Sequence, residues 1–219
     1  MSAVAEAFGV TVDWALPLQF NIAPTQMVAA VRVARGGVRE LCQLKWGLVP
    51  HWADDAKIGN RMINARADSV ATKPAYREAF KARRCLVVAD GFYEWQKSGR
   101  RKQPYYLRLR HDGPFGFAGV WERWSQAGQK IESCSIITTE ANELVAGIHD
   151  RMPVIIPPEA YELWLSPDTQ EIELLQSLLR PYPASEMVAY PVSDRINSPD
   201  RNDPECMKPQ PTVARTLFE

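Results

Sequence analysis

Leu86-Val87-Val88-Ala89-Asp90-Gly91-Phe92-Tyr93-Glu94-Trp95 is the stretch that decides the fold, because an apolar strand ends within it. The run from Cys85 to Ala89 is continuously apolar, which is typical of a strand buried on both faces. Asp90-Gly91 then predicts a bend or a bulge. Beyond the bend a carboxyl group stands among aromatic rings. The sequence therefore predicts a sheet core here with an ionisable residue at its rim.

Glu94 follows Phe92 and Tyr93 and precedes Trp95, so we expect its carboxylate beside aromatic walls. A carboxyl group that is partly withdrawn from water has a raised pKa, which suits a proton donor and acceptor near neutral pH. Strand alternation gives another interpretation, in which Phe92 and Glu94 share one face and Glu94 lies on a wet surface. Taken alone, this stretch favours the wet surface.

Short strands separated by tight turns surround this stretch. Residues 27–33 and 38–46 predict two strands joined at Arg35-Gly36-Gly37. Further strands are predicted at residues 105–110, 115–121, 131–138, 154–156 and 187–192, and short helices at residues 2–8, 73–84, 140–146, 159–165 and 169–180. This succession predicts an α+β fold with a largely antiparallel, barrel-like sheet flanked by short helices. One domain, residues 1–219, is expected, with an irregular tail from about residue 193.

The helix expected at residues 73–84 ends in the basic residues Lys81, Arg83 and Arg84. A basic helix end is usually solvated and complements the helix dipole. Over the whole chain, 26 basic and 26 acidic residues cancel, so no overall field indicates nucleic acid or membrane as a partner. Any nucleic-acid site must therefore be a local basic patch.

The four cysteines, at positions 42, 85, 134 and 206, lie far apart and form no Cys-x-x-Cys pair. With only three histidines beside them, this spacing argues against zinc, an iron–sulfur cluster or a disulfide framework. We therefore expect reduced thiols, no metal, no cofactor and a cytoplasmic location. No apolar run is long enough to span a bilayer, so no membrane association is expected.

Asn64, Glu94 and His149 are polar residues at the ends of apolar segments in three separate parts of the chain. A carboxylate, an imidazole and an amide form a working set for proton transfer and orientation. The spacing alone is also compatible with a structural role, because a lone histidine at the start of a strand is usually a hydrogen-bonded structural residue. The three residues are candidates for a catalytic group.

Five ordered motifs resemble the SOS response-associated peptidase (SRAP) family, the abasic site processing proteins. The motifs are Asn21-Ile22-Ala23-Pro24-Thr25, Trp46-Gly47-Leu48-Val49-Pro50, Ile63-Asn64-Ala65-Arg66, Asp90-Gly91-Phe92-Tyr93-Glu94-Trp95 and Ile148-His149-Asp150-Arg151-Met152-Pro153. The resemblance extends from the first helix to Asn202-Asp203-Pro204. It implies a β-rich domain with flanking helices that binds single-stranded DNA at an abasic site and links itself covalently to the sugar aldehyde.

By the same resemblance, Asn64, Glu94 and His149 are catalytic, and Arg66 contacts a DNA phosphate. The other expected DNA-binding residues are Asn21, Pro24, Pro50, Trp52 and Arg151. Arginine side chains can hold phosphates, and tryptophan and proline rings can lie against unstacked bases. The activity implied is that of an abasic-site crosslinking lyase that also removes its own N-terminal segment as an autopeptidase, in the response to DNA damage.

The start of the chain departs from the family pattern. Members begin Met-Cys-Gly-Arg and use the amine and thiol of the exposed cysteine to form a thiazolidine with the sugar aldehyde, whereas this sequence begins Met1-Ser2-Ala3-Val4. Either the printed sequence starts downstream of the natural start, or it is a variant that keeps the DNA groove without the crosslink. The first is favoured, because a protein released from catalysis has no chemical need for Asn64, Glu94 and His149.

Two other functions stay open from the sequence. One is a module that binds single-stranded DNA without chemistry, through Arg66, Arg151 and Trp52. The other is a thiol peptidase, in which Cys134 or Cys85 would act with His149 and Asp150. The second has less support, because no cysteine stands at a helix start or in a basic pocket that would favour the thiolate.

Overall fold

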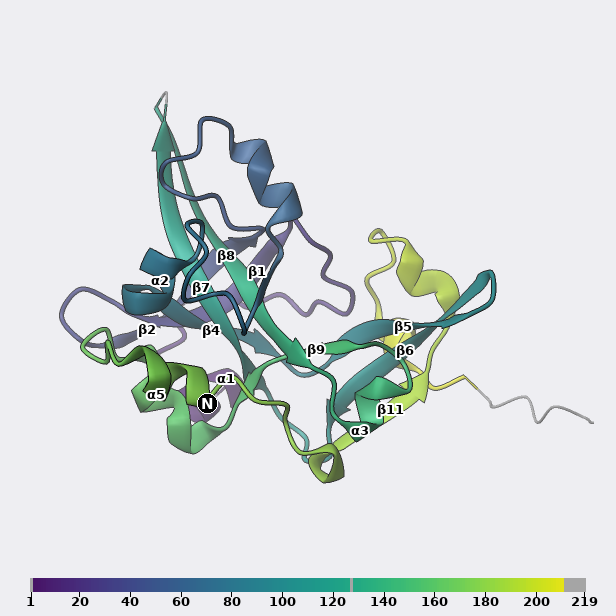
Figure 1. Ribbon diagram of the computed structural model, residues 1–219. Coiled ribbons are helices and arrows are strands. Elements are labelled where there is room, and N and C mark those ends of the chain that lie inside the picture. Colours follow the sequence, from purple (N-terminus) through teal and green to yellow (C-terminus); the bar gives the residue numbers. More distant parts are fainter. Residues whose placement is uncertain (1, 127, 211–219) are drawn as a thin grey trace, which may run out of the picture.

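The computed structural model describes residues 2–126 and 128–210. Its main feature is a closed barrel of five strands with a smaller sheet beside it (Figure 1). The barrel strands are β1 (Met27–Val33), β2 (Arg39–Trp46), β4 (Arg84–Ala89), β7 (Phe115–Gln126) and β8 (Gln129–Glu140). They follow the order β7-β4-β1-β2-β8, and the pairing of β7 with β8 closes the circle. The predicted barrel is thus confirmed.

Pairing within the barrel is antiparallel except at one seam, where β2 runs parallel to β8. Three short strands extend the barrel: β3 (Asn64–Arg66) and β9 (Arg151–Pro153) pair with β8, and β10 (Ile155–Ile156) pairs with β7. The smaller sheet has the order β11-β6-β5. Its strands are β5 (Phe92–Ser98), β6 (Arg101–Leu109) and β11 (Met187–Pro191).

Among the described residues, five short α-helices and several 3₁₀ helices complete the fold. The α-helices are α1 (Ala3–Phe8), α2 (Arg77–Ala82), α3 (Glu143–Ala146), α4 (Tyr161–Leu165) and α5 (Ile172–Ser177). The 3₁₀ helices are η1 (Ala56–Arg61), η2 (Pro158–Ala160), η3 (Ala184–Glu186), η4 (Asp194–Asn197) and η5 (Pro204–Met207). Over residues 2–126 and 128–210, no helix is long and apolar enough to cross a membrane.

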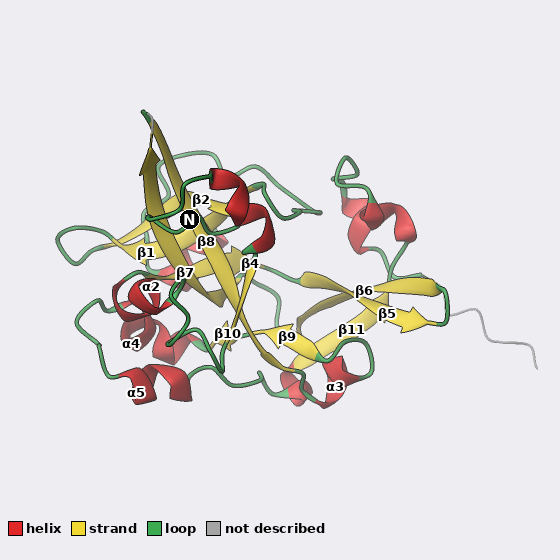
Figure 2. Cartoon of the chain, turned by 45° about the horizontal axis from the view of Figure 1, so that its top comes forward, coloured by secondary structure: helices red, strands yellow, loops and turns green. Residues whose placement is uncertain are grey.

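Alternation along the barrel strands sends side chains to two separate cores. On one face Leu86, Val120 and Ile137 pack with helical residues such as Phe80 and Trp164. Figure 2 shows these helices against the outside of the barrel. The opposite face therefore lines the barrel interior, and its side chains include Ala30, Leu44, Cys85, Val87, Cys134 and Ile136. This period of two is what a strand imposes, and here both faces are apolar.

The helices are shorter than predicted. The first helix is as expected, because the Ser2 hydroxyl accepts a hydrogen bond from the Ala5 amide and Gly9 ends the helix with a left-handed φ of 63°. The helix predicted at residues 73–84 begins only at Arg77, since turns precede it around Pro74. The strand predicted at residues 105–110 instead starts at Arg101 and forms a long hairpin with β5.

Arg84 is 2% exposed, so the expectation of a fully solvated basic helix end was wrong for this residue. Its guanidinium donates to the carbonyl oxygens of Phe80 and Lys81 at the end of α2, and to those of Trp164, Ser166 and Thr169 around the end of α4. Carbonyls at helix ends lack intrahelical partners, and a cation there is favourable. Arg84 thus joins two helices to strand β4.

The irregular tail was predicted from about residue 193 to the end of the chain, of which residues 211–219 lie outside the described residues. Residues 193–210 contain η4, η5 and one end of an isolated bridge between Val192 and Pro209. The segment is nevertheless anchored to the barrel side of the molecule. The side-chain amide of Asn21 donates to the carbonyl oxygens of Ile196, Ser198 and Arg201 at 3.0–3.1 Å. In return, the Asn202 side chain accepts from the Asn21 backbone amide.

Candidate active site

Glu94 lies in the middle of β5, opposite Tyr105 of β6. The bend at Asp90-Gly91 carries the chain out of the barrel strand β4 and into this second sheet. Gly91 is required there, because a Cβ on it would come within 2.3 Å of the Tyr106 ring. The predicted bend therefore has a packing cause, and it brings Glu94 to the junction of the two sheets.

The Glu94 carboxyl group is half-buried, and this burial raises its pKa above the ordinary glutamate range. A nearby His149 and the amide of Trp95 lower the pKa by smaller amounts, whereas Asp150 raises it. Phe92 and Glu94 do share one strand face, as alternation predicts, but the face is covered rather than wet. The raised pKa is the property that a proton donor and acceptor needs.

His149 is placed beside Glu94 by the turn that follows α3. Asn142 caps this helix, since its side-chain oxygen accepts from the Val145 amide at 2.9 Å and its amide donates to the Tyr182 carbonyl at 2.7 Å. His149 Nδ1 lies 3.1 Å from both the backbone amide nitrogen and the carbonyl oxygen of Arg151, so it accepts from the first or donates to the second according to the tautomer. Asp150 lies 3.2 Å from the same Nδ1 and can stabilise the protonated ring.

Gln96 connects the strand of Glu94 to the turn of His149. Its Nε2 donates to the Gly147 carbonyl oxygen at 2.7 Å, and its Oε1 accepts from the Tyr105 hydroxyl at 3.3 Å. Because Gln96 is two residues after Glu94 in β5, the two side chains lie on the same face. Sequence reasoning missed Gln96, since a glutamine in a strand carries no signal of its own.

Asn64, Arg66 and Arg151 flank the end of β8. Asn64 and Arg66 belong to β3, which pairs with Ile136 to Thr138, and Arg151 belongs to β9, which pairs with the last residues of β8. Asn64 is exposed, and its backbone carbonyl accepts from the Tyr76 hydroxyl at 3.3 Å. Arg151 donates to the Thr138 hydroxyl at 3.2 Å and to the Thr138 carbonyl. The barrel end thus presents an amide and two guanidinium groups.

Arg66 forms a two-pronged ion pair with Asp68, with Nε and Nη2 donating at 3.1 and 2.6 Å to the same carboxylate oxygen. This hydrogen bond is the main cause that lowers the pKa of Asp68. Both side chains are more than half exposed. An exposed pair of this kind is weak, and a phosphate offers the same two-pronged geometry to the guanidinium.

Pro50 and Trp52 lie in the turn after β2, and only Trp52 presents its ring to solvent, being 52% exposed. Pro50 is buried. Glu122, 8% exposed, supports this turn from β7, because its Oε2 lies 3.2 Å from His51 Nδ1 and accepts from Arg83 at 2.8 Å. The buried carboxylate was not recognised from the sequence, where Glu122 reads as an ordinary strand residue.

Asn21 and Pro24 lie near one another but differ in exposure. Asn21 is buried, and its side chain is used to hold the 196–201 segment, whereas Pro24 is exposed in the turn before β1. The next residue, Thr25, has a positive φ of 78°, an uncommon conformation for a β-branched residue. Any DNA contact of this turn is therefore made by Pro24 and its neighbours, with Asn21 as their support.

The thiols lie away from this group. Cys85 and Cys134 are fully buried inside the barrel, and burial raises the pKa of both. Burial also raises the pKa of the Cys42 thiol to about 11. Inert thiols of this kind give no support to the thiol peptidase. Within residues 2–126 and 128–210, no cluster of His, Cys, Asp and Glu could hold a metal ion.

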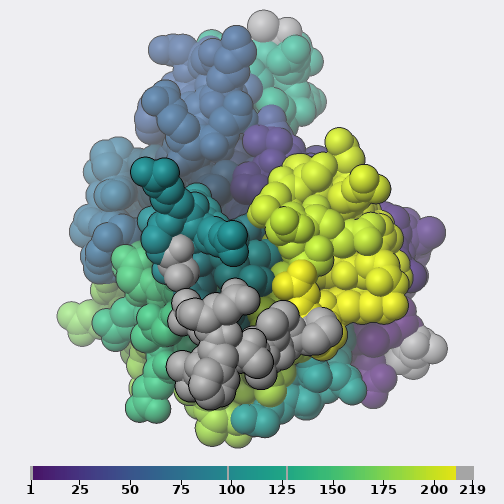
Figure 3. Space-filling model, turned by 90° about the vertical axis from the view of Figure 1, so that its right-hand side faces the viewer, coloured from purple at the N-terminus to yellow at the C-terminus, as the bar shows by residue number. Residues whose placement is uncertain are grey.

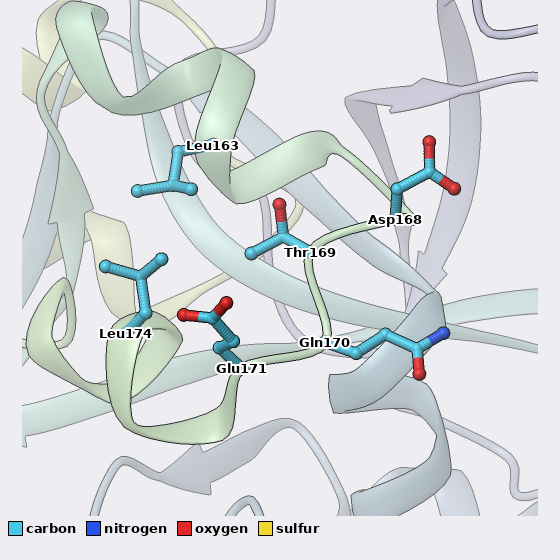
Figure 4. Close-up of a pocket in the computed structure, with 6 residues that line it drawn as sticks. All are labelled: Leu163, Asp168, Thr169, Gln170, Glu171 and Leu174. Atoms are coloured by element: carbon cyan, nitrogen blue, oxygen red, sulfur yellow. The ribbon is translucent and has the colours of Figure 1, made fainter.

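Cavity size does not locate the site. A cavity of about 600 Å³ opens between α4 and α5 (Figure 4) and contains none of the predicted site residues. In Figure 4, Leu163 and Leu174 face one another across it, while Asp168 and Gln170 point away. A smaller cavity of about 340 Å³ is lined by Asn21, Thr25 and Met27 among others, next to Pro24.

Three comparisons relate the chain to known proteins. Residues 1–199 match the protein family described as SOS response associated peptidase (SRAP). The chain is 44% identical over 191 residues to the abasic site processing protein YoqW of Bacillus subtilis. The matched region covers 86% of this chain and 85% of that protein. It is 34% identical over 196 residues to the abasic site processing protein HMCES of Gallus gallus, covering 78% of this chain and 58% of that protein.

Solved structures agree with the sequence comparisons. A crystallised protein from Bacteroides thetaiotaomicron superposes with a TM-score of 0.77 at 32% identity, covering 85% of this chain and 82% of that one. One from Bordetella bronchiseptica superposes with a TM-score of 0.76 at 27% identity, covering 87% and 94% of the two chains. The family match covers most of the chain, and the two named relatives are 44% and 34% identical to it. The resemblance predicted from the five motifs is therefore confirmed, and the chain belongs to the SOS response associated peptidase (SRAP) family.

Proposed function

We propose that this protein processes abasic sites in single-stranded DNA by covalent capture of the sugar aldehyde. The observation that carries the proposal is the half-buried Glu94 carboxyl group, whose pKa is raised, next to the His149 imidazole. Relatives with the name abasic site processing protein support the same chemistry. An abasic sugar in its open form carries an aldehyde, which an amine attacks.

The residues of the site suit each step of that attack. The amine nitrogen forms a bond to the aldehyde carbon while the carbonyl oxygen takes a proton from an acid. Loss of water then needs one proton delivered to the hydroxyl group and one removed from nitrogen. We assign these proton transfers to Glu94, because its raised pKa keeps a proton available. We assign opening of the sugar ring to His149. Asn64 orients the aldehyde or the amine with its exposed amide.

The basic and aromatic residues around this centre suit a flexible strand. Arg66 and Arg151 stand at the end of β8, where they hold phosphates, and Trp52 and Pro24 lie against unstacked bases. Arg66 can exchange Asp68 for a phosphate because the pair is exposed. The family resemblance assigns the nucleophile to an N-terminal cysteine, while the printed sequence has Ser2 after Met1.

The test uses two forms of the protein, the printed chain and an extended form with Met-Cys-Gly-Arg and an opening strand ahead of Ser2. Each is incubated with an abasic single-stranded oligonucleotide and run on a denaturing gel. We expect a heat-stable adduct from the extended form, and from the printed chain only an adduct that requires reduction with cyanoborohydride. Equal heat-stable adducts from both forms would show that the nucleophile is misplaced.

A second comparison separates chemistry from binding. In the extended form, Glu94→Gln should slow adduct formation by roughly 10²-fold or more, which is a typical contribution of general acid–base catalysis. Affinity for an intact single strand should stay unchanged, because Glu94 donates nothing to a phosphate. An adduct rate that is unaffected by Glu94→Gln would show that Glu94 transfers no proton in the reaction, whereas DNA binding without any adduct from the extended form would favour the alternative of a single-strand binding module without chemistry.

A further inference from the structure

The β5–β6 hairpin ends in a concentration of positive charge that the candidate active site does not use. The residues at its tip are Lys97, Arg100, Arg101 and Lys102, all of which are exposed. Gly99, with a positive φ of 60°, and Arg100 form the two-residue turn between Ser98 and Arg101. We call these four basic side chains the hairpin tip. The chain as a whole is neutral, so this is a local excess.

Nothing in the described structure neutralises the hairpin tip. Residues 95–110 include no aspartate or glutamate. In the part of the chain that the structure describes, no carboxylate lies within ion-pair distance of the four side chains. Many other cations of this protein are paired, for example Arg32 with Glu40 and Arg123 with Glu132. The hairpin tip is therefore free to meet an anion from outside.

The register of the hairpin makes this charge unfavourable in the isolated protein. Lys97 stands directly opposite Lys102, and like charges at directly opposed positions destabilise an antiparallel pair. Folding alone gives no reason for that arrangement. A bound polyanion would reverse the sign of the interaction, because each ammonium group would then face a phosphate.

Of the hairpin tip, Arg101 lies on the same face as the candidate active site, whereas Lys97 and Lys102 lie on the other face at the end of the same two strands. Glu94, Gln96 and Arg101 lie on one face of the same two strands, since Ser98 pairs with Arg101 in the register that pairs Glu94 with Tyr105. Lys97 to Arg100 are three to six residues beyond Glu94, which is ~10–20 Å of extended strand. Even at the ~3.4 Å rise of one strand in a duplex, this span holds at most about six phosphates, and an extended single strand places fewer along it. Figure 1 shows the hairpin projecting away from the barrel, and Figure 3, seen from that side, shows its dark teal atoms beside the yellow C-terminal region.

We infer that the hairpin tip binds the phosphate backbone of the DNA on one side of the abasic site, several nucleotides from the reacting sugar. The inference rests on the proposed function, because it takes the DNA to be centred on Glu94. It adds a second, purely electrostatic contact to a protein whose net charge gives no attraction. The binding carries no base specificity, since it is made to phosphates.

The test measures DNA affinity as a function of salt for the variant Arg100→Gln with Arg101→Gln. The control is Arg35→Gln with Arg180→Gln, which removes two exposed charges of the barrel side and leaves the same net charge. The probe is an oligonucleotide with one abasic site and at least eight nucleotides on each side. We expect the slope of log affinity against log salt to become shallower by about 1.4 in the hairpin variant, because ~0.7 of slope is lost per phosphate contact. The control should change by less than half of this.

Shortening the oligonucleotide locates the contact. Trimming one flank to two nucleotides should weaken binding by the wild-type protein several-fold and leave the hairpin variant unaffected. Trimming the other flank should weaken both alike. Equal slopes for the hairpin variant and the control, or equal sensitivity to trimming on both sides, would overturn the inference and leave the tip as a solubilising edge.

A second variant checks that the result does not come from misfolding. Lys97→Gln with Lys102→Gln should melt at the same temperature as the wild type or higher, because it removes the like-charge pair, and should lose salt-dependent affinity as the first variant does. A lower melting temperature with unchanged affinity would contradict the inference. Failure of the proposed function has a different signature, namely no preference of the wild type for abasic over intact DNA.

Discussion

Glu94 is a carboxyl group that the fold keeps partly out of water while placing an imidazole beside it. The sequence gives the local part of this arrangement, since the bend at Gly91 and the aromatic neighbours can be read directly. The sequence does not show what lies over Glu94, because the turn with His149 comes from a segment more than 50 residues away. Gln96, which links the two through the Gly147 carbonyl, has no sequence signal. Reasoning from the motifs therefore finds the candidate reacting groups and misses the side chain that connects their two elements.

Replacing Glu94 by glutamine should change stability in a pH-dependent way. The pKa of Glu94 is raised in the folded state, so the protonated carboxyl group stabilises the fold. This stability is fully present below the ordinary glutamate pKa, and it is lost as the pH rises through the raised pKa. The Glu94→Gln protein does not lose this stability as the pH rises, because glutamine does not ionise. Its melting temperature relative to the wild type should therefore increase between pH ~4 and pH ~7.5, as measured by thermal unfolding in matched buffers. A constant difference would mean that Glu94 is fully solvated.

Removing Gln96 should separate Glu94 from His149 without unfolding the protein. Gln96→Ala loses the 2.7 Å hydrogen bond to Gly147, so the turn after α3 is no longer held against β5. We expect the melting temperature to fall only slightly and the rate of adduct formation to fall by about 10-fold, because His149 is then no longer held beside Glu94. Gln43→Ala, an exposed position on β2, is the control and should change neither quantity.

At the scale of elements, long-range side-chain anchors decide how the short helices and the C-terminal segment are held. Helices of four to six residues cannot be stable by themselves, so tertiary contacts must fix their ends. Arg84 fixes α2 and α4, and Asn21 fixes the segment around η4. Hydrophobic periodicity indicated most helices and strands, but the expectation of a solvated basic helix end failed at Arg84. A sequence does not reveal that five carbonyl oxygens converge on one guanidinium.

Arg84→Met should destabilise the protein by about 3 kcal/mol or more, because several buried carbonyl oxygens then lose a charged donor. Arg84→Lys should have a smaller effect, since an ammonium group donates at most three hydrogen bonds in place of five. Denaturant unfolding monitored by tryptophan fluorescence gives both values. Arg110→Met is the matched control, because Arg110 is exposed and donates to a single carbonyl. A loss at Arg84 no larger than at Arg110 would contradict the anchoring role.

Asn21→Ala should loosen residues 193–207 while leaving the barrel intact. The variant removes the side-chain amide, whose two N–H groups are shared among three carbonyl oxygens of this segment, and each hydrogen bond contributes roughly 1 kcal/mol. Limited proteolysis followed by mass spectrometry should then show new cleavage between Val192 and Lys208, at protease concentrations that leave the wild type uncut. Cleavage elsewhere first would show that Asn21 supports a different part of the fold. Any loss of DNA binding in this variant would follow from the movement of the Pro24 turn.

At the scale of the whole molecule, closure of the barrel isolates its interior from reagents in solution. Cys85 and Cys134 are inside, and Cys206 of η5 is buried in a cluster with Tyr106, Val192 and Ile196. The pKa of the first two thiols is raised, so neither access nor ionisation favours reaction. The antiparallel strands and their closure followed from the spacing of apolar runs and turns. The sequence did not show which face of each strand lines the barrel interior, because both faces are apolar.

Iodoacetamide at pH ~8 should therefore leave Cys85, Cys134 and Cys206 unmodified in the native protein, with at most slow reaction at the less buried Cys42. All four should react within the same time once the protein is unfolded in guanidinium chloride. Peptide mapping by mass spectrometry distinguishes the sites. Rapid native alkylation of Cys134 would restore the thiol peptidase as a serious alternative, because it would require a reactive thiolate that the barrel excludes.

The parallel seam between β2 and β8 has a consequence for the order of folding. Only Lys45–Ser133 and Trp46–Cys134 are paired across it, whereas the β1–β2 and β7–β8 hairpins have long registers between neighbours in sequence. Contacts between residues almost 90 positions apart are slow to form, so the hairpins should assemble first and the seam should close last. The same seam should open first under native conditions. Amide hydrogen exchange should then be faster at Gly47, which donates across the seam to the Cys134 carbonyl, than at amides within the β4–β7 ladder.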